Sequence, residues 1–298
     1  MEYEKPPLTF EEQADQLSLR GLMADRDELI QLLSAVNYYR LSGYLYPFRE
    51  APGDTFRPNT TLSEVWERYC FDRRLRVLIL DAVERIEVAV KSQLVYHFTH
   101  QFGAFGHLDD RNLPKLKIAD YLKWRTQLQE ETGRSKEIFC KAFFVKYGDT
   151  HKEPPLWMLC ELMSMGSLLT FLKGVEPPLL AKVGAPWQMP DELLISWLSS
   201  LYAARNLCAH HSRLWNRELG YQPKLPNKNK FPDWQGPSKL INNRCGIILL
   251  ICRYWLGMIS PSSRWAERVE LLFTDYPRIP NADMGLPDDW RQHPVWKV

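Results

Sequence analysis

The chain has 298 residues, of which 45% are hydrophobic and 25% are charged. This length permits one large domain or two small ones, and the composition excludes an intrinsically disordered chain. The net charge of +2 identifies no partner by itself, but the charge is unevenly distributed. Residues 1–35 hold eight acidic and three basic residues, whereas residues 205–245 hold eight basic and two acidic residues. The second segment is therefore either a surface that attracts a polyanion or a solvated basic loop.

The six cysteines show no C-x-x-C pair and lie mostly within apolar runs, so we expect buried free thiols in a reducing compartment. The N-terminal stretch is acidic and has no apolar core, unlike a signal peptide. The apolar run 246–259 is too short to span a bilayer and contains Arg253, so it is expected to be a buried helix. We expect a cytoplasmic protein without a membrane partner.

The N-terminal region is predicted to form short helices. Thr9 and Glu12 are placed to form the capping box of a first helix, which ends at Gly21. Residues 25–36 predict a second helix with acids in its first turn. An aromatic-rich segment, 36–50, follows it.

Residues 61–103 have a different character, with no proline or glycine before the last position. Apolar residues recur there at steps of three and four, which predicts one face of a long helix. Glu87 and Lys91 are placed to form an i,i+4 ion pair on another face. A helix of this length would span roughly 60 Å, so we expect a kink in it.

Strand signals are nearly absent from the remainder of the chain. Glycine and proline clusters separate further expected helices at 118–132, 135–147, 156–173, 191–211, 238–259 and 263–274. The segment 215–237 is expected to be a long basic loop, and 276–298 an extended tail that wraps the body. We predict an all-α fold with three parts, namely an N-terminal helical extension (1–59), a helical core (60–260) and a C-terminal helix with the tail (261–298).

The candidate site lies at the end of the helix expected at 191–211, which Asp191 is placed to cap. Asn206 and His210 are four residues apart and share a face, so the asparagine can hydrogen-bond the imidazole and fix its tautomer. Arg205 and His210 are five apart, about 140° round the helix axis. They converge only if the helix frays near His210 or if the arginine reaches another copy of the chain.

Arginine and histidine in this pattern suit the cleavage of RNA. Histidine, whose ordinary pKa is about 6.5, can take a proton from a 2′-hydroxyl or give one to the leaving 5′-oxygen. Arginine can stabilise the charge of the transition state, so this chemistry requires no metal ion. The basic residues downstream are candidates to guide the RNA: Arg213, Arg217, Lys224, Lys228 and Lys230.

A purely structural role for Arg205 and His210 is the alternative. The spacing of Arg205 and His210 is expected by chance in a chain of this composition. In that case Arg205 packs on a carboxylate, and His210 only ends a helix. A related hypothesis is that a carboxylate of the long helix, Glu84 or Glu87 beside Arg85, orients Arg205; the alternative there is a solvated, salt-bridged face.

Two other groups of residues could carry chemistry. His97, His100 and His107 could hold zinc, although two of them can simply end a long helix. Bases could stack on Tyr38, Tyr39 and Tyr44 with Arg40 on a phosphate, although packing of these rings against the core is favoured.

The stretch "RNLCAH" at 205–210 resembles the R-polar-x(3)-H signature of the HEPN superfamily. The blocks "VNYYRLSGYLYPFRE" (36–50), "YCFDRRLRVLILDAVERIEVAVKSQL" (69–94) and "ARNLCAHHSRLWNREL" (204–219), with Phe56 after the first, occur in one order. Together they resemble the Abi-like proteins of bacterial abortive infection, the AbiD and AbiF group, over roughly residues 10–260.

This resemblance implies an all-helical HEPN-type bundle and a role in phage defence. It implies a metal-independent endoribonuclease that works as a homodimer, since HEPN sites pair two such motifs and this chain has one. Arg205 and His210 would be catalytic, Asn206 would be the polar residue after the arginine, and His211 fits the looser spacing of the signature. No cofactor is implied other than a structured small RNA. The alternatives are a non-catalytic module that binds RNA or a structured small RNA, and a regulatory dimer.

Overall fold

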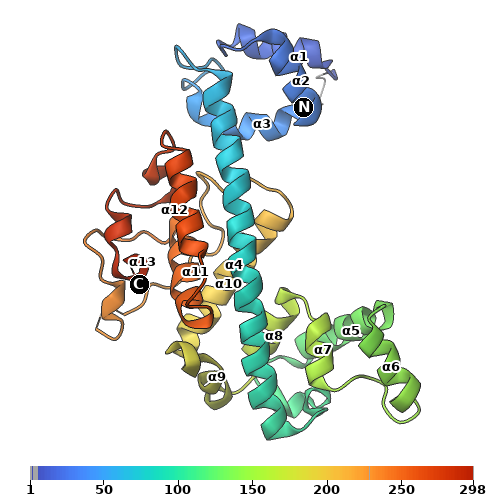
Figure 1. The fold of residues 1–298 in the computed structure, drawn as a ribbon. Coiled ribbons are helices and arrows are strands. Elements are labelled where there is room, and N and C mark those ends of the chain that lie inside the picture. Colours follow the sequence, from blue (N-terminus) through green and yellow to red (C-terminus); the bar gives the residue numbers. More distant parts are fainter. Residues whose placement is uncertain (1, 3–5, 228, 298) are drawn as a thin grey trace.

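The computed structural model describes residue 2, residues 6–227 and residues 229–297. One long helix, α4 (Leu62–Phe102), runs through the molecule, and the other helices are grouped near its start, its middle and its end (Figure 1). Thr61 and Glu64 form a capping box at its start, and Gly103, with φ of 78°, ends it. The predicted pair of Glu87 and Lys91 is confirmed, with a separation of 2.9 Å.

The kink expected in α4 is not observed, because its helical hydrogen bonding is unbroken over 41 residues. Sharp kinks need a proline, a π-bulge or an inserted group, and the sequence of α4 supplies no proline or glycine. Different helices also cover α4 along its length: α3 (Tyr38–Leu45), α7 (Leu156–Leu162), α9 (Pro177–Gly184), α10 (Asp191–Ala209), α11 (Cys245–Ile259) and α12 (Trp265–Asp275). Each buries a portion of the apolar face, so the helix needs no single partner of equal length.

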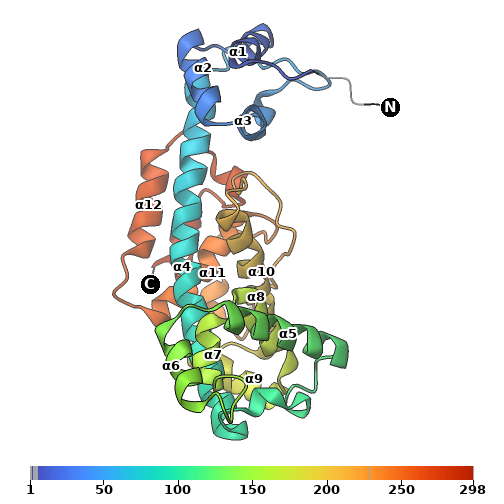
Figure 2. The ribbon, with the colours of Figure 1, turned by 90° about the vertical axis from the view of Figure 1, so that its right-hand side faces the viewer.

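The N-terminal region folds into three short helices beside the start of α4 (Figures 1 and 2). The capping box of Thr9 and Glu12 is confirmed, and Gly21 takes the left-handed conformation after the first helix, with φ of 97°. An isolated bridge between Met23 and Thr61 ties this region to α4. The helices are α1 (Phe10–Leu19), α2 (Arg26–Ala35) and α3 (Tyr38–Leu45).

Five helices follow in the region of the C-terminal half of α4 (Figure 1). They are α5 (Ile118–Arg134), α6 (Ile138–Tyr147), α7 (Leu156–Leu162), α8 (Met165–Gly174) and α9 (Pro177–Gly184). Of these, α7, α8 and α9 contact α4, and α5 packs on α7 and α8. The single helix expected over 156–173 is wrong, since Ser164 starts a new helix by accepting a hydrogen bond from the Ser167 amide. The helix α9 was not expected; prolines occupy its first positions, where a missing amide proton costs nothing.

The remaining helices lie beside the middle of α4. They are α10 (Asp191–Ala209), α11 (Cys245–Ile259), α12 (Trp265–Asp275) and α13 (Pro294–Lys297). The helix expected from 238 begins only at Cys245, because Asn243 is instead paired through its carbonyl with the Leu219 amide, 2.7 Å away. The C-terminal tail lies on the body with short helical turns and buries Trp290 and Trp296, rather than remaining extended throughout.

The all-α prediction is confirmed for the described residues, in which two isolated bridges are the only β-type pairing. No helix in the described ranges is long and apolar enough to cross a membrane. The cysteines are free thiols, buried except for the half-buried Cys70. The divisions at residues 60 and 260 stay a prediction.

Candidate functional site

The helix α10 carries the candidate site at its C-terminal end. Its core-facing side chains are Leu194, Trp197, Leu198, Leu201, Ala204 and Cys208. The cap expected from Asp191 is wrong, because Pro190 is the residue before the helix and no side chain accepts from the first turn. Burial raises the pKa of the Cys208 thiol to about 12, so the cysteine inside the motif is inert.

Arg205 and Asn206 are half-buried neighbours in the last turns of α10. The Arg205 guanidinium donates to the Asn206 amide oxygen at 3.4 Å, and the described residues give it no carboxylate partner. The hypothesis that a carboxylate of α4 orients Arg205 is not supported. Glu87 pairs with Lys91, and Glu84 is exposed.

The expected hydrogen bond from Asn206 to the His210 imidazole is also absent among the described contacts. The amide oxygen of Asn206 faces Arg205 instead, while the Asn206 carbonyl accepts from the His210 amide at 3.0 Å. His210 therefore still continues the backbone bonding of α10, and the helix does not fray before it. Arg205 and His210 are left on different sides of the helix, as their spacing of five residues dictates.

The end of α10 is a complete Schellman turn. The His211 amide donates to the Cys208 carbonyl at 3.0 Å, and the Ser212 amide donates to the Leu207 carbonyl at 2.8 Å. His211 occupies the left-handed position, with φ of 56°, where glycine is usual. His210 and His211 are both exposed, so the turn presents two imidazoles to solvent.

A buried carboxylate holds the segment after this turn. Asp72 of α4 has no exposed surface, and it accepts from the amides of Leu214 at 3.1 Å and Trp215 at 2.7 Å. The Tyr44 hydroxyl donates to it at 2.5 Å, and the Arg76 guanidinium is its ion-pair partner. Burial raises the pKa of Asp72, while these donors favour the ionised form. We call Asp72, Tyr44 and Arg76 the buried latch.

An open pocket of about 470 Å³ lies between α3 and the segment that the latch holds. We call it the arginine pocket. Arg40 donates to the carbonyl of His211, Arg213 donates to the carbonyl of Gly43 at 2.8 Å, and Arg217 is exposed. No described residue that lines the pocket is acidic; the lining consists of Asn37, Tyr39, Arg40, Gly43, Tyr44, His211, Ser212, Arg213 and Arg217.

The structure divides the basic residues that were predicted to guide RNA. Arg213 and Arg217 line the arginine pocket, beside the C-terminal end of α10. Lys224 and Lys230 instead line a hollow beside Asp191 and Glu192, at the N-terminal end. A helix of this length separates the two groups by about 25 Å. Lys228 lies outside the described residues.

Lys224 is also tied into the structure at its end of α10. Its ammonium group pairs with Glu192 at 2.6 Å, and its amide donates to the Ser196 hydroxyl at 2.8 Å. Its carbonyl accepts from the Trp197 indole at 2.9 Å. The charge of Lys224 is therefore balanced by an acid of α10.

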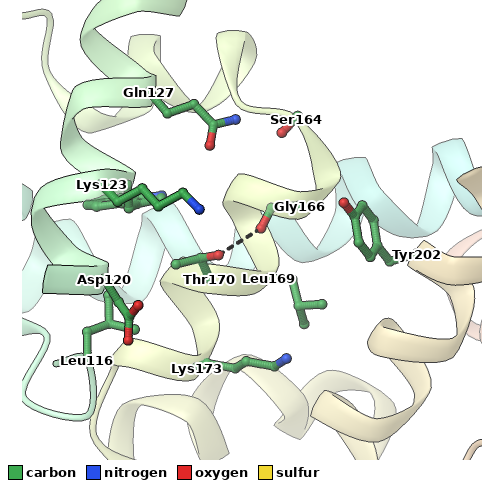
Figure 3. A pocket seen from close by; sticks show the side chains of 11 residues that line it. Leu116, Asp120, Lys123, Gln127, Ser164, Gly166, Leu169, Thr170, Lys173 and Tyr202 are labelled. Carbon is green, nitrogen blue, oxygen red and sulfur yellow. Dashed lines mark hydrogen bonds between the residues drawn. The ribbon is translucent and has the colours of Figure 1, made fainter. Parts of the chain in front are cut away.

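A second pocket, of about 500 Å³, lies between α5 and α8 and is closed on one side by Tyr202 of α10 (Figure 3). Tyr202 is three and four residues before Arg205 and Asn206, so the three share a face of the helix. Lys123 and Lys173 extend into this pocket, but Asp120 stands on the same wall as Lys123 (Figure 3). Its lining therefore carries both signs of charge.

The other two groups of candidate residues are the three histidines and the three tyrosines. His107 is fully buried, and burial together with Arg125 lowers its pKa to about 3, so it is a neutral packed side chain. No three potential metal ligands gather within the described ranges. Tyr44 belongs to the latch and Tyr38 accepts from Arg20 at 2.9 Å, which leaves Tyr39 as the exposed ring.

The comparisons with known proteins give one match. The family model described as Abi-like protein matches residues 31–216, more than half of the chain. No curated protein and no solved structure shows a significant match. The matched range runs from α2 to the segment held by the latch and includes Arg205, His210 and Arg213. At the level of the family, this match suggests a role in phage defence by abortive infection. The chain belongs to the Abi-like protein family.

Proposed function

We propose that this protein is a metal-independent endoribonuclease of the HEPN type that acts in abortive infection. One observation carries the proposal. Arg205, Asn206 and His210 all lie at the accessible C-terminal end of α10, where Arg205 has no carboxylate partner among the described residues. An arginine that only stabilises a fold is usually paired with an acid, so one without such a partner, at the same helix end as two exposed histidines, favours a role toward an anionic ligand.

The reaction proceeds within the RNA strand. An imidazole takes the proton of a 2′-hydroxyl, and the 2′-oxygen forms a bond to the adjacent phosphorus. The bond from phosphorus to the 5′-oxygen then breaks, and a second imidazole gives that oxygen a proton. Arg205 stabilises the additional negative charge on the phosphorus group. The products are a 2′,3′-cyclic phosphate and a 5′-hydroxyl.

The geometry of α10 favours a site built from two copies of the chain. Because the helix does not fray before His210, Arg205 and His210 of one chain diverge by about 140°. A second copy packed along α10 supplies the complementary arginine and histidine, and also the second imidazole. Light scattering should find a dimer at micromolar concentrations. A monomer that retains ribonuclease activity would contradict this part of the proposal.

A second candidate function is binding without cleavage. It is favoured by the arginine pocket, which can hold RNA whether or not the histidines react. A structured small RNA bound there as a cofactor, and a purely regulatory dimer, are variants of this candidate. Unlike the proposed enzyme, none of these candidates cleaves RNA.

The test is incubation of the pure protein with total RNA in the presence of EDTA. The wild type should cleave, and His210→Ala should not, while both retain the same circular dichroism spectrum. His211→Ala is the matched control, because it removes an exposed imidazole from the next position. An inactive wild type would favour the binding module. Loss of activity in His211→Ala alone would mean that the second histidine is the reacting one.

A further inference from the structure

We propose that the arginine pocket binds a backbone phosphate of single-stranded RNA, with the adjoining base stacked on Tyr39. This inference deepens the proposed function and rests on it for the identity of the strand. The phosphate would lie beside the turn that carries His210 and His211, so the pocket would set which nucleotide reaches them.

The orientation of the guanidinium groups is the first support. Arg40 and Arg213 each donate to a backbone carbonyl, of His211 and Gly43 respectively. A guanidinium has five N–H donors, so each arginine is fixed in place and keeps donors for a ligand. Arg217, exposed on the rim, has no partner among the described residues. Side chains fixed before binding lose little conformational entropy when the ligand arrives.

The charge of the lining is the second support. Three arginines line the arginine pocket, and the described lining residues include no acid. The buried acid Asp72 accepts a hydrogen bond from Tyr44, which lines the pocket, and is paired with Arg76. The pocket of Figure 3 is of similar volume, but there Asp120 offsets part of the charge of Lys123 and Lys173. Of these two pockets, the arginine pocket is therefore the better phosphate site.

Tyr39 is the third support. Its side chain is 75% exposed at the edge of the arginine pocket. The ring of Tyr38 packs edge-on against it, with centroids 5.9 Å apart and planes at 85°, and Arg20 holds the Tyr38 hydroxyl. A large aromatic ring held this way and left exposed offers a face on which any base can stack. An arginine cluster beside such a ring is the combination that binds single strands without sequence preference.

The experiment measures binding separately from cleavage. Full-length protein with His210→Ala is titrated against a fluorescein-labelled oligouridylate, and the anisotropy is recorded over a series of salt concentrations. In this background, Arg217→Ala should weaken binding about tenfold and reduce the slope of log K against log salt by about 0.7, the value for one contact to a single strand. Tyr39→Ala should weaken binding about tenfold, and Tyr39→Phe should restore it, since stacking needs only the ring.

The matched control is Lys123→Ala, which removes one exposed positive charge from the pocket of Figure 3. It should leave both the affinity and the salt slope unchanged. Equal losses for Lys123→Ala and Arg217→Ala would overturn the proposal, because binding would then reflect overall charge. Unchanged binding in Arg217→Ala and Tyr39→Ala would overturn it as well.

Competition distinguishes a strand from a free anion. Inorganic phosphate and uridine monophosphate should displace the labelled strand only at concentrations far above that of unlabelled oligouridylate. If the mononucleotide competes as well as the strand, the pocket serves a free nucleotide and the proposal is wrong. If these binding results hold while the wild type cleaves no RNA, the proposed function fails and the phosphate site stands.

Discussion

The two ends of α10 use basic residues in opposite ways, although both groups come from the segment 205–245. At the C-terminal end, Arg213 and Arg217 line a pocket without an acid among its described residues. At the N-terminal end, Lys224 pairs with Glu192, and this contact lowers the pKa of the glutamate. Basic residues that are clustered in the sequence therefore need not form one basic surface in the fold. Whether a basic residue is available to bind an anion depends on which acidic residues the fold places beside it.

The largest expected effect compares one residue from each end. Arg205→Ala should slow single-turnover cleavage of a short RNA by about 10²- to 10³-fold, because a charge-stabilising donor is lost. Lys230→Ala, at the opposite end, should change the rate by less than about twofold, since an exposed charge some 25 Å away acts only through screened long-range attraction. Equal effects of the two substitutions would mean that the two ends of α10 do not differ in their part in cleavage.

The next effect concerns the latch that holds the C-terminal end in place. Asp72→Asn should lower the free energy of unfolding by about 3 kcal/mol, because Arg76 is left buried without its partner. Urea denaturation measures the difference. The control is Asp81→Asn on the same helix, where the acid pairs with Arg85 and Arg268 at 2.9 Å each but is partly exposed. That change should lower the free energy of unfolding by less than about 1 kcal/mol. A similar loss for both variants would mean that the buried latch does not stabilise the fold more than a surface ion pair does.

The stability of the fold should depend on pH through the buried His107. His107 has its pKa lowered to about 3 by burial, so the folded chain keeps it neutral while the unfolded chain protonates it near its ordinary value. The unfolded state then binds more protons below about pH 6.5, and stability falls as the pH falls. Between pH 7 and pH 5 the loss should be about 2 kcal/mol greater in the wild type than in His107→Gln.

Urea denaturation at the two pH values checks this expectation. Equal losses in the two proteins would mean that His107 is charged in the fold. If the difference is found, His107→Gln becomes the better background for pH–rate profiles, since its activity at acid pH is less affected by unfolding.

Asn206→Ala should slow cleavage less than Arg205→Ala does. The amide makes one hydrogen bond of 3.4 Å to Arg205, and a bond of that length orients the guanidinium without contributing charge. Cleavage should fall by less than about tenfold, as measured in the same single-turnover assay. A fall as large as that of Arg205→Ala would give the asparagine a direct part in the reaction.

The local features of the molecule could be predicted from the sequence. The capping box of Thr9, the unbroken apolar face of α4 and the end of α10 near His210 depend on residues a few positions apart. Arg205 and His210 therefore lie at the end of a helix, as the sequence predicts. The break before Ser164 was missed because a single serine cap gives a weak signal within an apolar run.

The contacts that shape the site could not be predicted in the same way. Asp72 meets Trp215 across 143 positions of the chain, and Arg40 meets His211 across 171. One signal was available, since Asp72 lies in register with Leu75 and Ile79 on the apolar face of α4, where a carboxylate needs buried partners. The separation of Arg217 from Lys224 had no such signal, because it depends on how the loop returns along α10.

In the proposed reaction, the C-terminal end of α10 cleaves RNA through attack by an internal 2′-oxygen. The most direct test is mass spectrometry of the products formed from one synthetic oligoribonucleotide in the presence of EDTA. The proposed mechanism predicts fragments that end in a 2′,3′-cyclic phosphate, paired with fragments that begin with a 5′-hydroxyl, and no cleavage of the matching DNA. Fragments that begin with a 5′-phosphate, or equal cleavage of DNA, would contradict it.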